Sequence, residues 1–401
     1  MVQIDLHSIE PPMTRKMILP GATLGVMGGG QLGRMFVQAA QSMGYFTAVL
    51  DPDLTSPAGL VAHYHIAADY LDEQGLAQLL QRCAAITTEF ENVPAGALVT
   101  LGAYRAVAPG ADAVAICQDR ATEKAQFRRC AVRCAPFALI DTPERLAAVA
   151  DNLLPGILKT ARLGYDGKGQ RRVANRAELA AAWHALGQVP CVLEQLLPLA
   201  LELSVLVARS GSGQVVRLPV QQNLHRDGIL AVTQVPAPDA SPALQQQAAE
   251  AAVALADAMD YVGVLCVEFF VLRDGSLVAN EMAPRPHNSG HWSVDGSDVS
   301  QFELQVRTLT SLPLTAPRQH SAAVMLNLLG DLWFPAGPGS AETTPPWADV
   351  LALPGAHLHL YGKTSARPGR KMGHLTVTAA NPASARATGC QAAALLGLPA
   401  F

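Results

Sequence analysis

The sequence lacks the features of several large protein classes. Its 401 residues carry a net charge of −4 with no basic stripe, which is not typical of a nucleic-acid-binding protein. No apolar run approaches the roughly 18 residues that a membrane-spanning helix needs. Residues 1–17 contain charged residues and prolines in place of the apolar core of a signal peptide, so we expect a disordered extension and a cytoplasmic protein with no membrane partner.

Cysteine pairs at metal-binding spacing are also missing. The seven cysteines include no C-x-x-C pair, and their odd number argues against a disulfide framework. Cys130 and Cys134 are one helical turn apart, and we interpret them as small buried hydrophobic residues.

What is present predicts several domains of mixed architecture. Hydrophobic residues make up 50% of a chain too long for one ordinary core. Alternating strands and helices predict an α/β, Rossmann-like domain at 18–115. A small α+β module follows at 116–200, and 201–401, where hairpins replace crossover helices, forms a C-terminal α+β domain.

A glycine-rich turn opens the first predicted helix. Gly28, Gly30 and Gly33 fit G-x-G-x-x-G between a strand and a helix, and Asp51 ends the next strand. This is the dinucleotide fingerprint in its usual context, so an NAD-dependent oxidoreductase is one hypothesis. Two alternatives remain: the turn binds a phosphate-bearing substrate, or it is a tight turn that binds no ligand.

Two glutamates give the sharpest signal. Arg273 to Ser276 reads as a two-residue Asp-Gly hairpin turn, and continuing that register places Glu268 directly opposite Glu281 on one face. Facing carboxylates in apolar strands repel, so they need a shared proton, a basic partner such as Arg285, or a cation. Oxygen-only ligation suits Mg²⁺.

Further polar residues cluster around two loops. Gly164 to Gln170 contains three glycines that can wrap phosphate oxygens, although it is not a Walker A motif and also fits an ordinary hairpin turn. Glu194 and Glu202 lie at strand ends, where a ribose contact or a solvated carboxylate is expected. Arg120 and Lys124 share one helix face, which fits either ligand binding or a solvated charged surface.

The order of these motifs resembles the ATP-grasp superfamily, and within it the 5-(carboxyamino)imidazole ribonucleotide synthase family. The segments that carry the likeness are GGGQLGRM (28–35), TEFENVP (88–94), DRATEK (119–124), GYDGKGQ (164–170), NEMAPRPHNSGHW (280–292), SQFELQVR (300–307) and GKTSARPGRKMGHL (362–375). The resemblance implies an ATP-grasp fold in which 116–200 contains the lid.

It also implies an activity and its ligands. ATP and bicarbonate would form carboxyphosphate, which carboxylates 5-aminoimidazole ribonucleotide, with two Mg²⁺ ions (Mn²⁺ as a substitute) and a homodimeric enzyme. By motif match, the ATP-binding residues would be Arg120, Lys159, Gly164, Tyr165, Asp166, Gly167, Lys168, Gly169, Gln170, Glu194, Gln195, Leu196, Leu197, Glu202, His225 and Asn280, with Glu268 and Glu281 as the metal ligands. The ribonucleotide would be held by Gln31, Leu32, Glu89, Asn288, Lys363, Arg370 and Lys371.

The resemblance further assigns catalytic roles. Arg285 and His287 would orient bicarbonate and carboxyphosphate with Asn288 beside them, and Asp166 would enter the site on lid closure. The position two residues after Glu281, an asparagine in many ATP-grasp enzymes, is Ala283, which leaves a third side-chain metal ligand unassigned. A ligase for a different amine and a catalytically silent nucleotide-binding regulator remain alternatives.

Overall fold

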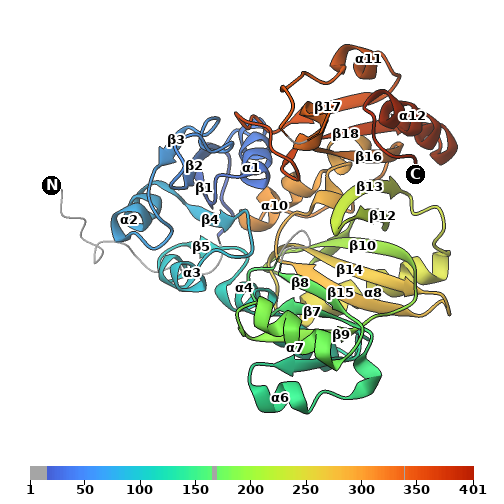
Figure 1. Ribbon diagram of the computed structural model, residues 1–401. Coiled ribbons are helices and arrows are strands. Elements are labelled where there is room, and N and C mark those ends of the chain that lie inside the picture. Colours follow the sequence, from blue (N-terminus) through green and yellow to red (C-terminus); the bar gives the residue numbers. More distant parts are fainter. Residues whose placement is uncertain (1–15, 165–168, 338) are drawn as a thin grey trace.

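The computed structural model describes residues 16–164, 169–337 and 339–401, which form three sheets (Figure 1). Most of the expected N-terminal extension, residues 1–15, and the loop residues Tyr165, Asp166, Gly167 and Lys168 lie outside the described residues. Within the described ranges, no helix combines the length and apolarity needed to cross a membrane.

The first sheet is parallel, as the alternating pattern predicts. Its strand order is β3-β2-β1-β4-β5, and every neighbouring pair runs parallel. Its apolar strands are covered by amphipathic helices such as α1, whose Leu32, Phe36 and Val37 are buried. The bounds are β1 Thr23–Met27, α1 Gln31–Ser42, β2 Phe46–Leu50, β3 Tyr64–Ile66, α2 Glu73–Arg82, β4 Ala85–Thr88, α3 Ala95–Gly102, β5 Ala106–Val107 and α4 Ala111–Cys117.

The second sheet is small and antiparallel. Its strand order is β6-β9-β7-β8, and α7 packs on it around the buried Trp183. The preceding helix α5 begins where Asp119 accepts hydrogen bonds from the amides of Ala121 and Thr122, a normal N-cap. The bounds are α5 Arg120–Arg129, β6 Phe137–Ile140, α6 Pro143–Ala147, β7 Gly156–Thr160, β8 Gln170–Val173, α7 Arg176–Ala185 and β9 Cys191–Gln195.

The third sheet has nine strands and is antiparallel. Its order is β15-β14-β10-β12-β13-β16-β18-β17, with β11 on β10. The bounds are β10 Leu199–Arg209, β11 Val215–Arg217, β12 Gln221–Arg226, β13 Ile229–Val235, α8 Pro242–Ala258, β14 Gly263–Leu272, β15 Leu277–Ala283, α9 Ser293–Gly296, α10 Gln301–Leu309, β16 Ala322–Leu329, α11 Trp347–Leu351, β17 Ala356–Leu360, β18 Lys371–Ala379 and α12 Pro382–Leu395.

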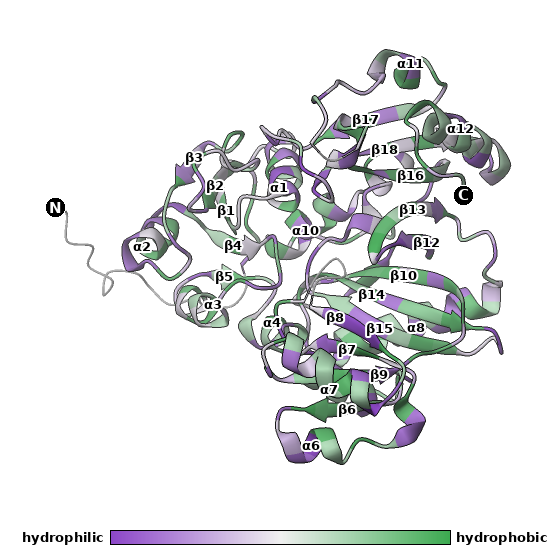
Figure 2. Cartoon of the chain, in the orientation of Figure 1, coloured by the Kyte–Doolittle hydropathy of each residue, from purple (hydrophilic) through white to green (hydrophobic). Residues whose placement is uncertain are grey.

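Alternate residues of β10 serve two cores, because neighbouring strand residues point to opposite faces. Val205 and Val207 pack in the cluster that contains α8, while Leu206 and Ala208 pack with Leu304 of α10. Both faces of β10 and β14 are therefore apolar along most of their length, as the colouring in Figure 2 shows.

Helix α10 joins the first and third sheets. Phe302, Val306 and Leu309 share a buried cluster with Leu24 and Phe36 of the first domain. Helix α10 contacts both β4 and β14, and the loop after β4 lies beside the end of the β14–β15 hairpin (Figure 1). The predicted residues Glu89, Glu268 and Glu281 lie on these segments.

Candidate active site

The two glutamates predicted to bind metal lie opposite each other in the β14–β15 hairpin, as predicted. The turn that connects the strands differs from the prediction. The amide of Gly275 donates to the carbonyl of Leu272 (2.9 Å), and Gly275 has a φ of +81°. The connection therefore has three residues with a left-handed glycine at its end, and the predicted two-residue turn is wrong.

A β-bulge at Asn280 compensates for the extra turn residue. Pairing passes from Phe269 opposite Ala279 to Glu268 opposite Glu281, so Asn280 is the additional residue. Asn280 and Glu281 both face the cavity that Glu268 lines, and Asn280 Nδ2 lies 3.5 Å from Glu268 Oε2. Asn280 Oδ1 is buried and finds no hydrogen-bond partner within the described chain.

The two carboxylates have different electrostatic surroundings. Burial, reinforced by the charge of Glu281, raises the pKa of Glu268 to about 7, although nearby His225 opposes this shift. Burial also acts on Glu281, but Arg120, 3.1 Å from its carboxylate, and Lys159 hold its pKa below the usual value. Glu281 therefore has a basic partner, although that partner is Arg120 and not Arg285.

Glu194 is buried between two lysines. Its carboxylate lies 3.0 Å from Lys124 Nζ and 2.9 Å from Lys159 Nζ. Burial opposes its ionisation, but the two ammonium groups outweigh burial and lower the pKa of Glu194 to about 2. The interpretations of Glu194 as a solvated strand end and of Lys124 as part of a solvated surface are wrong, because tertiary packing encloses both side chains.

Glu202 and His225 form a charged pair on adjacent strands β10 and β12. His225 Nδ1 contacts a carboxylate oxygen of Glu202. Burial disfavours the imidazolium, yet this hydrogen bond and the carboxylates of Glu268 and Glu281 raise the pKa of His225 to about 9. The ring is therefore positively charged at neutral pH.

These groups surround a cavity of about 250 Å³ between the second and third sheets. The residues predicted from the sequence to bind ATP line it wherever the structure describes them. They are Arg120, Lys159, Gly164, Gly169, Gln170, Glu194, Gln195, Leu196, Leu197, Glu202, His225 and Asn280, and Glu268 and Glu281 complete the wall. The predicted entry of Asp166 concerns a residue outside the described ranges.

A second cavity of about 380 Å³ lies between the first and third domains. Its lining includes Gln31, Leu32, Glu89, Arg285, His287, Asn288 and Lys371, which were predicted to contact the ribonucleotide or bicarbonate. Both amide atoms of Asn288 are buried and lack hydrogen-bond partners in the described chain, so they are available to a ligand.

The two cavities share one wall. Six residues line both of them: Arg120, Gly164, Glu281, His287, Asn288 and Lys371. A group held at this wall can contact ligands in both cavities.

Lys363 and Arg370, predicted to bind the substrate phosphate, line neither cavity. Lys363 Nζ donates to the carbonyl of Lys371 (2.5 Å), and Arg370 Nη1 donates to the carbonyl of Ser365 (2.8 Å). Their predicted contact with a phosphate therefore stays a prediction.

The glycine-rich turn before α1 already holds carboxylates of the protein itself. Glu89 accepts hydrogen bonds from the amides of Gly30 (2.9 Å) and Gly33 (3.0 Å). Asp51 accepts from the amide of Gly29 (2.7 Å) and from Tyr70 Oη (2.7 Å). These are the donors that a dinucleotide would need, so the structure does not support the NAD hypothesis.

Sequence reasoning missed Glu91 and Glu123 as members of the site, and it left open whether Lys124 binds a ligand or lies on a solvated surface. Glu91 pairs with Arg285 and lines the larger cavity. Glu123, whose pKa is raised to about 7 by burial, accepts from the amide of Met282 (2.6 Å). Lys124 Nζ also donates to the carbonyl of Asn280 (2.9 Å), which fixes the bulge. Glu91 lies in the segment TEFENVP (88–94), and Glu123 lies in DRATEK (119–124). Membership of these segments is the sequence signal that could have identified them.

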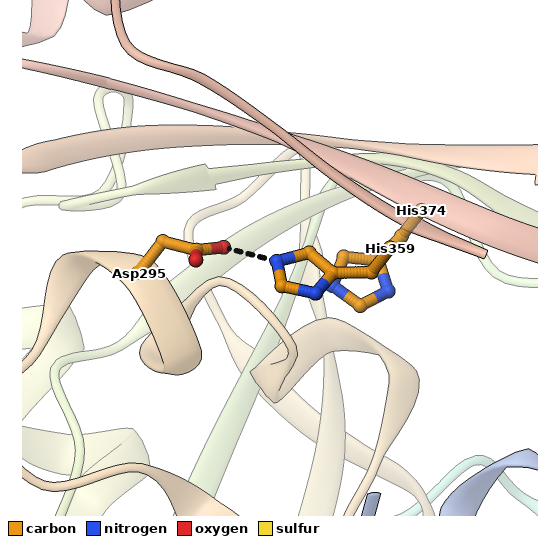
Figure 3. A group of neighbouring side chains, drawn as sticks. All are labelled: Asp295, His359 and His374. Atoms are coloured by element: carbon orange, nitrogen blue, oxygen red, sulfur yellow. Dashed lines mark hydrogen bonds and ion pairs between the residues drawn. The ribbon is translucent and has the colours of Figure 1, made fainter. Parts of the chain in front are cut away.

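Another group of possible ligands, Asp295, His359 and His374, lies apart from both linings (Figure 3). His359 Nε2 lies 2.8 Å from Asp295 Oδ2, and the rings of His359 and His374 stack with centroids 4.5 Å apart at 16°. A metal ion lies near the plane of each imidazole that binds it. Two nearly parallel, stacked rings therefore cannot share one ion, and this cluster does not fit a metal in the observed arrangement.

Comparison with known proteins places the chain in a family. Three family profiles match it: the ribonucleotide synthetase preATP-grasp domain at 21–118, the ATP-grasp domain at 125–302 and the phosphoribosylaminoimidazole carboxylase C-terminal domain at 323–388. An N5-carboxyaminoimidazole ribonucleotide synthase of Brucella melitensis is 45% identical over 371 residues, which cover 91% of this chain and 98% of the relative.

Solved structures give the same result. The N5-carboxyaminoimidazole synthetase of Staphylococcus aureus with ADP aligns with a TM-score of 0.86 at 35% identity, covering 95% of this chain and 98% of that one. The Aspergillus clavatus enzyme, solved with ADP and 5-aminoimidazole ribonucleotide, aligns with a TM-score of 0.85 at 31% identity, covering 94% and 98%. The chain has the ATP-grasp fold and belongs to the N5-carboxyaminoimidazole ribonucleotide synthase family, ATP-dependent ligases of purine biosynthesis.

Proposed function

We propose that this chain carboxylates the exocyclic amine of 5-aminoimidazole ribonucleotide with bicarbonate, at the expense of ATP. The observation that carries the proposal is the wall shared by the two cavities. It places a cation, a carboxylate, an imidazole and an amide between two ligand spaces. A reactive intermediate formed from one ligand can there meet the other without crossing bulk water.

The smaller cavity is suited to ATP. Lys159 and Arg120 supply positive charge for the triphosphate, and the paired Glu202 and His225 offer further polar contacts. Glu268, Glu281 and the unpartnered Oδ1 of Asn280 form an oxygen-only donor set of the kind that Mg²⁺ prefers. When bound, Mg²⁺ would neutralise phosphate charge. Asn280 would then be the third side-chain ligand, which Ala283 cannot supply.

The larger cavity is suited to the ribonucleotide. Asn288 has two unpartnered amide atoms facing this space, and Gln31 and Leu32 line its side nearest the first domain. Lys371 at the shared wall, with Lys363 and Arg370 behind it, supplies the positive charge expected around a substrate phosphate.

We infer that Arg285 and His287, which line the larger cavity, orient bicarbonate. A bicarbonate oxygen takes the γ-phosphoryl group, and ADP leaves as the O–P bond of ATP breaks. The amine of the ribonucleotide then attacks the carboxyl carbon of carboxyphosphate, and inorganic phosphate leaves. Arg285 is positioned to stabilise the developing negative charge, and Glu91 holds its guanidinium in place. The homodimer and the cytoplasmic location stay predictions.

Phosphate release measured with purified protein tests the proposal. We expect release from ATP only when aminoimidazole ribonucleotide and bicarbonate are both present, with one phosphate for each carbamate formed. Glu281→Gln should reduce the rate by about 100-fold or more, because it removes charge at the metal-binding edge. Release that requires a different amine would show that the substrate assignment is wrong while leaving the fold assignment intact.

A further inference from the structure

Hydrogen bonds hold His287 both at its backbone and at its ring. Its backbone is fixed by Gln301, whose Oε1 accepts from the amide of His287 (2.8 Å) and whose Nε2 donates to the His287 carbonyl (2.9 Å). Its ring is fixed by Ser289, whose Oγ lies 2.9 Å from His287 Nδ1. The other ring nitrogen, Nε2, lies 3.4 Å from Glu268 Oε1 and faces the shared wall.

Ser289 belongs to a buried polar network that crosses the third sheet. Thr233 Oγ1 donates to Asn223 Oδ1 (2.9 Å), Asn223 Nδ2 donates to Ser204 Oγ (2.9 Å), and Ser204 Oγ donates to Ser289 Oγ (2.8 Å). Both serines and Thr233 are 0% exposed, and Asn223 is 7% exposed. Such a network is costly in a sheet interior unless every member is satisfied, and it fixes geometry when they are.

The side-chain amide of Asn223 and the backbone amide of Ser289 fix the direction of hydrogen bonding at the two ends of this network. Because Thr233 donates to Asn223 Oδ1, the amide nitrogen of Asn223 faces Ser204 and occupies one of its lone pairs. The single hydroxyl proton of Ser204 is shared between Ser289 Oγ (2.8 Å) and Gln221 Oε1 (3.0 Å), which can only accept. The backbone amide of Ser289 donates to His287 Nδ1 (3.4 Å), and an Nδ1 that accepts from this amide also takes the hydroxyl proton of Ser289. Nδ1 is therefore an acceptor.

We propose that Ser289 and Ser204 are positioning residues that hold the proton of His287 on Nε2, so that the ring donates a hydrogen bond into the shared wall. The recipient is an oxygen of the carboxyphosphate intermediate, a small oxyanion that needs donors on the side away from Arg285. The inference rests on the proposed function for the identity of that oxyanion. The direction of the hydrogen bonds is independent of it.

Kinetics of serine variants test the positioning role. Ser289→Ala and Ser204→Ala should each lower kcat by about 10-fold while KM for ATP and ribonucleotide changes by less than about 2-fold. Each change removes a contact that orients His287 and leaves the contacts with the ligands in place. Ser210→Ala is the matched control, because Ser210 is a buried serine with two hydrogen bonds that lines neither cavity. It should keep the kcat of the unmodified enzyme.

Nitrogen-15 NMR of the histidine rings tests the tautomer directly, with His287→Gln used for assignment. We expect a proton on Nε2 and none on Nδ1 of His287, and we expect Ser289→Ala to reduce this preference, because only the backbone amide of residue 289 then donates to Nδ1. A proton on Nδ1 in the unmodified protein, or a kcat of Ser289→Ala equal to that of Ser210→Ala, would overturn the proposal. If the unmodified protein released no phosphate with both cosubstrates, the proposed function would fail instead, and the NMR result would still decide the tautomer.

Discussion

At the scale of single residues, the charged side chains that line the two cavities are held by ion pairs with residues distant in the sequence. Glu268, Glu281 and Arg120 line the cavities as expected. The pair of Glu91 with Arg285 joins residues 194 positions apart, and no local pattern carries that information. The complete burial of Lys124 was equally hidden, because it depends on how α5 packs against β15.

Glu194 gives a prediction at this scale. Glu194→Gln leaves Lys124 and Lys159 as buried cations without a counter-charge, so it should lower the free energy of unfolding by about 3–5 kcal/mol at pH 7. The folded-state pKa of Glu194, about 2, lies below the unfolded value of about 4.3. Its stabilising effect is therefore present above about pH 4.3 and is lost as the pH falls toward 2.

Urea unfolding across pH checks this account. The gap between the unmodified protein and Glu194→Gln should be constant from pH 7 to about 5 and should shrink below about pH 4.3. The exposed Glu250 provides the control, since Glu250→Gln should change stability by less than about 0.5 kcal/mol. A gap that widens on acidification would contradict the assigned direction of the pKa shift.

At the scale of elements, the hairpin shows why the predicted pairing was correct although its turn was not. The left-handed Gly275 adds one residue to the connection, and the bulge at Asn280 adds one to β15, so the two shifts cancel at Glu268 and Glu281. Turn type and bulges depend on twist and on contacts such as Lys124 with Asn280, which the alternating pattern of the strands does not encode.

Two glycine variants test the turn. Gly275→Ala should lower the free energy of unfolding by about 1 kcal/mol, because a side chain is strained at a φ of +81°. Gly96→Ala is the matched control, since Gly96 lies in α3 with open space around its Cα and should stabilise the protein by about 0.5–1 kcal/mol. Equal effects of the two changes in urea unfolding would show that Gly275 carries no strain.

At the scale of the whole molecule, three sheets meet around two cavities with a common wall. The order of motifs along the chain predicted the fold class and the two ligand-binding regions. It did not predict the shared wall, because that wall combines α5 with the loop after β15, which α10 holds against the first domain. Distant packing of this kind is set by tertiary structure and leaves no periodic trace in the sequence.

The central claim is that Glu268, Glu281 and Asn280 hold divalent cations against the phosphates of the nucleotide. Anomalous diffraction from crystals grown with ADP and Mn²⁺ as a heavier substitute tests it most directly. The account predicts metal peaks about 2.1 Å from carboxylate oxygens of both glutamates and bridged to the ADP phosphates. Bound ADP with no peak at these residues, or a peak only at Asp295 and His359, would contradict it.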